Sequence, residues 1–186
     1  MKRVIILFLI LFANFVAGAQ KITPYYGPFP EPAPNNNMLF YLQRTVDRNT
    51  VIYELNYDAG GQLNEKKPVK VYWIDFENGA KISQLTFVQN TFAYGVSSEL
   101  IDKDKKIYEI NLVSYKKIKF YLKPSGVNNH YQTHAVIKGK PAILKRVFIS
   151  IIGGTQFNPI ISYIELIGND LQSGLEILEQ IKPDRD

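Results

Sequence analysis

Two arginines are the residues whose type and position in this sequence could carry out binding chemistry. Arg44 and Arg146 each stand in an apolar stretch with strand-like alternation, and in both stretches the alternation places the arginine on the apolar face. A buried guanidinium without a partner is costly, so each arginine should meet a carboxylate, a set of carbonyl groups or an anionic ligand. If both point into one cavity, they would suit the recognition of a carboxylate or a phosphate.

The alternative interpretation of these arginines is structural. Each could form an ion pair within the protein, or lie at a rim with only its aliphatic stem buried. The strand acids that could pair with them are Glu54, Asp75, Glu109, Glu165 and Glu179. Tyr53 and Trp73 complete the candidate ligand-binding set, because the chain is rich in aromatic residues, and such side chains can line a pocket or a sugar-binding surface.

The first element that must position this set is a predicted β-hairpin from Leu39 to Tyr57. With Arg48 and Asn49 as its loop, Arg44 lies opposite Tyr53. One face of the hairpin is then apolar apart from the arginine, which predicts that this face is covered by the rest of the protein.

A second predicted hairpin runs from residue 131 to residue 152. With Gly139 and Lys140 as its loop, Thr133 lies opposite Arg146 and Ala135 opposite Leu144. Its apolar face again contains one arginine. A ribbon this apolar is expected in the middle of a sheet rather than at its edge.

Metal and nucleophilic chemistry have little support in the sequence. His130 and His134 are the only histidines, and on a strand they would lie about 13 Å apart, too far to share one metal ion. Ser125 and Ser173 stand in ordinary turn contexts, and no serine lies in a G-x-S-x-G elbow. We predict no metal and no cofactor, and a hydrolase stays a secondary alternative.

The first 19 residues have the pattern of a signal peptide. Lys2 and Arg3 precede an apolar run and the small residues Ala17-Gly18-Ala19, so we expect export to the periplasm or beyond. No transmembrane span is expected after cleavage, and the absence of cysteine excludes disulfide bonds. The net charge falls from +5 to +3 without Lys2 and Arg3, which is too mild to indicate nucleic-acid binding.

The mature chain is expected to contain a leader and one domain. Residues 20–37 are rich in proline and predict an extended leader, and residues 38–186 predict a single β-rich domain. Apolar residues at spacings of three and four between Ile82 and Tyr94 predict one helix, with Val88 and Phe92 on its buried face. The period-two pattern elsewhere predicts a mainly β fold, an antiparallel β-barrel or β-sandwich of about nine strands with one inserted α-helix.

Several of these segments resemble those of a known family. The FYLQRTVDRNTVIYELN hairpin, the VYWIDFENG strand and turn, the LTFVQNTFAYGV helix and the late SYIELIGND strand are together similar to domain of unknown function 4833, an uncharacterised family of secreted bacterial proteins. The resemblance extends from about Met38 to about Ile181. It implies one compact secreted domain, and because the family has no assigned activity, it implies no functional residue.

Three functions are therefore expected, in this order. The first is a non-enzymatic secreted or periplasmic binding protein that holds a small amphipathic or anionic ligand in its interior through Arg44, Arg146, Tyr53 and Trp73. The second is an envelope module that binds a protein or a glycan, with an exposed aromatic patch and no sizeable internal cavity. The third is a hydrolase in which His130 or His134 lies close to a serine or a carboxylate.

Overall fold

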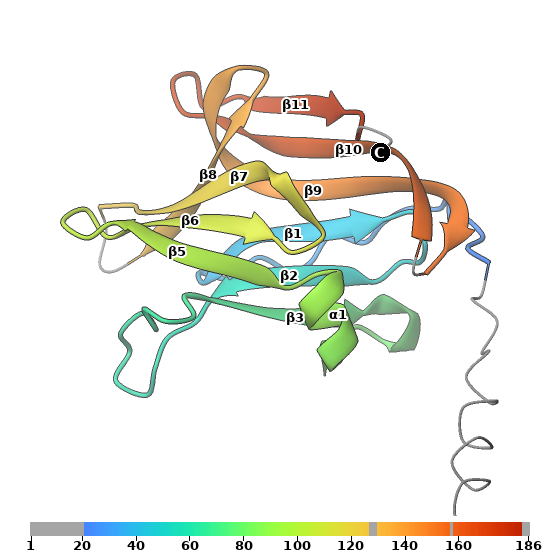
Figure 1. Cartoon of the computed structure of the whole chain (residues 1–186), viewed down its shortest axis with the longest axis horizontal. Coiled ribbons are helices and arrows are strands. Elements are labelled where there is room, and N and C mark those ends of the chain that lie inside the picture. Colours follow the sequence, from blue (N-terminus) through green and yellow to red (C-terminus); the bar gives the residue numbers. More distant parts are fainter. Residues whose placement is uncertain (1–20, 127–129, 157, 184–186) are drawn as a thin grey trace, which may run out of the picture.

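The computed structural model describes residues 21–126, 130–156 and 158–183 (Figure 1). The predicted signal peptide, residues 1–19, lies outside these residues. Within the described part of the chain, no helix is both long enough and apolar enough to cross a lipid bilayer.

The described residues form one curled, open sheet of eleven strands with a single short α-helix (Figure 1). This confirms the predicted mainly β fold with one inserted helix. Nine strands follow one another in the order β4-β3-β2-β1-β9-β8-β7-β6-β5, and β10 and β11 continue from β9. The elements are β1 (Met38–Arg44), β2 (Thr50–Leu55), β3 (Val69–Asp75), η1 (Phe76–Asn78), β4 (Lys81–Gln84), α1 (Phe87–Phe92), β5 (Val96–Asp102), β6 (Ile107–Leu112), β7 (Tyr115–Pro124), β8 (Tyr131–Ile137), β9 (Lys140–Thr155), β10 (Asn158–Asp170) and β11 (Glu176–Ile181).

Strand β9 joins the two halves of the sheet. Its residues 140–143 pair with β8 in antiparallel orientation, and its residues 146–149 pair with β1 in parallel orientation. Strand β10 pairs along both stretches, so β8 and β1 occupy successive parts of the opposite edge of β9. The sheet is therefore mixed, because the β1 and β9 pairing is parallel whereas all the other strand pairings are antiparallel.

Two wings diverge from β9 and enclose the core between them. The first wing is β1–β4 and the second wing is β5–β8. Phe40 of the first wing stacks on Tyr53, with 4.3 Å between ring centroids, and meets Phe120 of the second wing at 5.6 Å. The cluster also contains Leu42, Val51, Leu55, Tyr108, Ile110, Leu122, Ile137 and Leu144. Large apolar side chains thus fill the space between the wings.

The Pro-rich leader lies against the outer face of the sheet. The backbone N–H of Tyr25 donates to the Thr45 carbonyl at 2.8 Å, and Gln43 Nε2 donates to the Pro30 carbonyl at 2.7 Å. The ring of Phe29 packs edge-on against Phe148, with 5.1 Å between centroids. These contacts attach the leader to β1 and β9.

Helix α1 lies within the predicted helical segment but is shorter. It begins after Thr86, whose hydroxyl accepts from the Gln89 backbone N–H while the Gln89 side chain accepts from the Thr86 N–H, a capping box. The predicted buried face is wrong, because Val88 and Phe92 are 50% and 69% exposed. The flanking Leu85 and Tyr94 pack on the core instead.

Candidate functional site

Arg44 ends β1 on the inner side of the first wing. The β1 and β2 register places Leu42 opposite Val51 and Phe40 opposite Tyr53. This register differs from the predicted one by four residues, an even number, so the side chains from Phe40 to Arg44 keep their predicted faces. Arg44 therefore lies on the same side of the sheet as Phe40 and Leu42, above the core.

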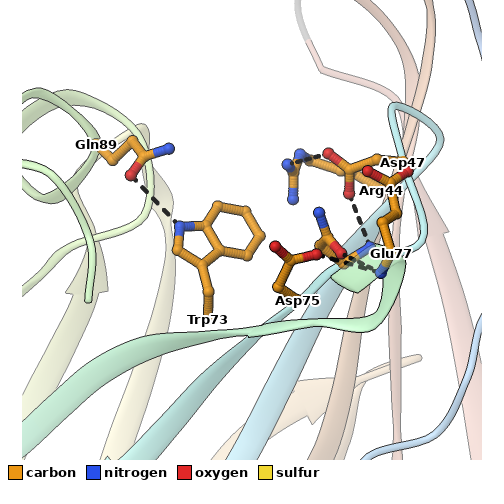
Figure 2. Close-up of polar contacts among 7 residues, drawn as sticks. Arg44, Asp47, Trp73, Asp75, Glu77 and Gln89 are labelled. Atoms are coloured by element: carbon orange, nitrogen blue, oxygen red, sulfur yellow. Dashed lines mark hydrogen bonds and ion pairs between the residues drawn. The ribbon is translucent and has the colours of Figure 1, made fainter. Parts of the chain in front are cut away.

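The guanidinium of Arg44 is held by two aromatic rings and one carboxylate, and Figure 2 shows it with Trp73 and Asp47. Its Cζ atom lies 4.3 Å from the ring centroid of Trp73 and 4.9 Å from that of Tyr94. Nη2 donates to Asp47 Oδ2 at 2.8 Å, and the side chain is only 8% exposed. Nη1 is buried and has no hydrogen-bond partner within the described residues. One donor of a buried cation is thus left unsatisfied, which is unusual and costly.

A pocket of about 230 Å³ opens beside this arginine. We call it the Arg44 pocket, and its lining residues are Arg44, Asp47, Asn49, Trp73, Asp75, Ser83 and Gln89. They come from β1, the turn after it, β3, β4 and α1. The wall on the side of α1 is closed by Gln89, whose Oε1 accepts from Trp73 Nε1 at 3.4 Å (Figure 2). The capping box of α1 fixes this glutamine, so helix formation and pocket geometry depend on the same side chain.

Two aspartates give the Arg44 pocket an acidic balance. Asp47 Oδ1 accepts from the Asn49 backbone N–H at 2.8 Å while its Oδ2 pairs with Arg44. Asp75 caps η1 and accepts from the backbone N–H groups of Glu77 and Asn78, each at 3.2 Å. With one guanidinium and two carboxylates among the lining residues, the formal charge of the pocket is −1.

Tyr53 supports the site from below without lining it. Its hydroxyl donates to the Tyr94 carbonyl at 2.9 Å, which fixes the segment that carries the Tyr94 ring over Arg44. Burial raises the pKa of the Tyr53 hydroxyl far above its ordinary value, so this group is a permanent donor. Burial also raises the pKa of Tyr94, and the neighbouring Arg44 opposes that rise. The structure thus brings Arg44, Trp73 and Tyr53 together.

The prediction that Arg146 shares an inner face with Leu144 is wrong. Gly168 of β10 lies opposite Leu144, but the preceding Ile167 lies opposite Arg146, so Lys145 is an extra residue in β9. This β-bulge reverses the alternation, because one inserted residue turns every later side chain to the other face. Arg146 therefore lies on the outer face.

There, Arg146 is opposite Tyr41 in the neighbouring strand and over the ring of Phe148, at 4.9 Å from Cζ to the centroid. Its Nε atom is buried without a hydrogen-bond partner among the described residues. The hairpin turn itself also differs from the predicted one. Ile137 pairs with Lys140, so Lys138 and Gly139 form the loop, both with positive φ.

The two histidines lie away from the Arg44 pocket. His134 is opposite Tyr121 and Ile143, and burial and the charge of Lys123 lower its pKa. The backbone carbonyl of His130 accepts from both the N–H and the hydroxyl of Ser125. No group of three histidine, cysteine or acidic side chains in the described ranges could hold a metal ion.

The sequence interpretation missed most of the polar residues of the pocket. Asp47, Asn49, Ser83 and Gln89 belong to it without having been predicted. For Gln89 a signal was present, because threonine followed three residues later by glutamine is a capping-box pattern that places the glutamine at the start of a helix. Ser83 lies in β4 opposite Trp73.

Comparison with known proteins gives one match. The family model described as "Domain of unknown function (DUF4833)" matches residues 40–180, which include all the strands except the first two residues of β1 and the last residue of β11. Neither the curated proteins nor the solved structures gave a match. Since the family model covers well over half of the sequence, the chain belongs to the family of domain of unknown function 4833.

Proposed function

We propose that this protein is an exported, non-enzymatic binding protein, periplasmic or secreted, whose ligand site is the Arg44 pocket. The observation that carries the proposal is the unsatisfied Nη1 of a buried arginine that lines an open pocket rather than a sealed core. An acceptor supplied by a ligand would satisfy this donor and gain a charge-assisted hydrogen bond.

The form of the domain also supports binding at the edge of the first wing. Large side chains of both wings fill the space between them, whereas the pocket lies where the turn after β1 meets β3, β4 and α1. Its walls are rigid, since Arg44 is stacked, Gln89 is held by the helix cap and Asp75 caps a turn. Preorganised donors and acceptors of this kind reduce the entropic cost of holding a ligand.

Native mass spectrometry of the protein purified from its own host tests this function. The wild type and Arg48→Ala should carry the same bound small molecule, because Arg48 is an exposed arginine in the turn beside the site. Arg44→Gln and Ser83→Ala should both lose it. Ser83→Ala removes a hydroxyl that has no hydrogen bond within the described residues, so its fold should be unchanged. Retention of the molecule in both site variants would refute the proposal.

A second candidate function is an envelope module that binds another protein. Helix α1 exposes two aromatic rings, with Phe87 and Phe92 exposed to 79% and 69%, and Val88 lies between them. Exposed apolar clusters of this kind mark interaction surfaces. Capture of one protein by the wild type and by Arg44→Gln, but not by Phe87→Ser/Phe92→Ser, would support this function over the first.

A further inference from the structure

We infer that the ligand of the Arg44 pocket is an uncharged polyhydroxylated molecule with the chemistry of a sugar ring; this inference rests on the proposed function. It differs from the anionic ligand that the arginines alone suggested.

The charge of the lining residues disfavours an anion. The guanidinium of Arg44 is already paired with Asp47 at 2.8 Å, and Asp75 adds a second carboxylate to the wall. A ligand carboxylate or phosphate would therefore enter a site whose formal charge is −1, and it would meet like charges on two sides. A cationic ligand would instead meet Arg44, whose buried Nη1 needs an acceptor and repels a positive group.

The free hydrogen-bonding groups of the pocket are mixed. Among the described residues, the donors without a hydrogen bond include Arg44 Nη1, Asn49 Nδ2, Ser83 Oγ and Gln89 Nε2. Asp47 and Asp75 keep acceptor capacity beyond the bonds already described. A hydroxyl both donates and accepts, so a ring bearing several hydroxyls can donate to the carboxylates and accept from the amides and the guanidinium. A carboxylate only accepts and would leave the two aspartates unused.

The size of the pocket and the burial of Trp73 indicate how the ligand is held. A volume of about 230 Å³ is smaller than the roughly 300–1,000 Å³ typical of drug-sized ligand pockets, so one ring or the end of a chain would fit. Trp73 is only 8% exposed, and one face of its ring is covered by Arg44. The indole therefore positions the arginine through a cation–π contact, and hydrogen bonds rather than ring stacking hold the ligand.

Isothermal titration of the purified protein with paired sugars tests the inference. The neutral probes are glucose, galactose, mannose and N-acetylglucosamine, the anionic probes are glucuronate, galacturonate and inorganic phosphate, and the cationic probe is glucosamine. We expect at least one neutral sugar to bind at neutral pH, with its uronate weaker on the order of tenfold because of like-charge repulsion. Asp75→Asn should narrow this difference, since asparagine also caps a helical turn but carries no charge.

The outcomes separate the two proposals. A uronate, phosphate or glucosamine that binds more tightly than every neutral sugar, and that is lost in Ser83→Ala, would overturn the inference and leave the proposed function intact. If no probe binds, the molecule that the protein retains from its host tests the inference, because its mass identifies it. A neutral polyol would support the inference, and an ion would overturn it. An empty host protein that binds no probe would overturn both proposals.

Discussion

The guanidinium of Arg44 lies over the indole of Trp73, 4.3 Å from the ring centroid, and its Nη2 atom donates to Asp47 Oδ2 at 2.8 Å. Four segments meet through this one cation: the end of β1, the turn after it, strand β3 and the segment after α1 that carries Tyr94. The cation is buried, so its stability depends on each of these partners. The geometry of the Arg44 pocket therefore depends on contacts that can be removed one at a time.

We expect Asp47→Ala to lower the free energy of unfolding by about 1.5–3 kcal/mol, because it leaves the buried guanidinium of Arg44 without its carboxylate. Urea denaturation followed by circular dichroism measures the change. The double variant Arg44→Met/Asp47→Ala should recover part of the loss, since it removes the unpaired charge. Equal stability of the single and double variants would show that the unpaired charge of Arg44 does not cause the loss of stability in Asp47→Ala.

Tyr53→Phe should cost about 1–3 kcal/mol, because it leaves the carbonyl of Tyr94 without its buried donor. Tyr26→Phe is the matched control, since Tyr26 is largely exposed. Thermal unfolding of both variants gives the comparison. Similar midpoints for the two would contradict the role of this hydrogen bond.

Phe120→Ala should destabilise the fold by about 3–5 kcal/mol, because Phe120 is fully buried where the two wings meet. Phe87→Ala removes a side chain of the same size from the exposed surface of α1 and should change stability by less than about 0.5 kcal/mol. Chemical denaturation of the pair tests whether the second wing covers the first. A small effect at Phe120 would argue against a shared core.

Stability should fall as the pH decreases through the range below about 6.5, the ordinary pKa of histidine, because of His134. Burial and Lys123 lower its folded pKa, so the unfolded chain binds a proton at a higher pH than the folded chain does. The stabilising contribution is thus complete above the unfolded pKa and is lost as the pH falls toward the folded one. His134→Gln should flatten this dependence in melting curves taken between about pH 7.5 and 5.5. If the melting temperature of His134→Gln depends on pH as steeply as that of the wild type, other titrating groups cause the loss of stability.

The alternation of side chains between the two faces of a strand explains which site residues could be predicted from the sequence. Arg44 keeps its predicted face because the first hairpin is shifted by an even number of residues. Arg146 does not, because the bulge at Lys145 inserts one residue, and the segment from Leu144 to Val147 has no glycine or proline that would signal it. The sequence pattern fits both alternations equally well.

Long-range arrangement was beyond prediction for a similar reason. The parallel pairing of β1 with β9 joins strands that are far apart in the chain and follows from no local turn. Helix α1 was predicted in the right place because its apolar spacing is local, but that spacing does not tell whether Val88 and Phe92 meet the core or solvent. The polar pocket residues come together only through tertiary packing.

The shared edge of β9 sets an order of events during folding. Thr45, at the end of β1, bonds through its hydroxyl to the backbone of Ile151, which is 106 residues later in the chain. The edge of β1 therefore stays open until β9 is in place, and closing so long a loop slows folding. An open strand edge can pair with other unfolded chains, so the stage before β9 adds to β1 is the one most exposed to aggregation.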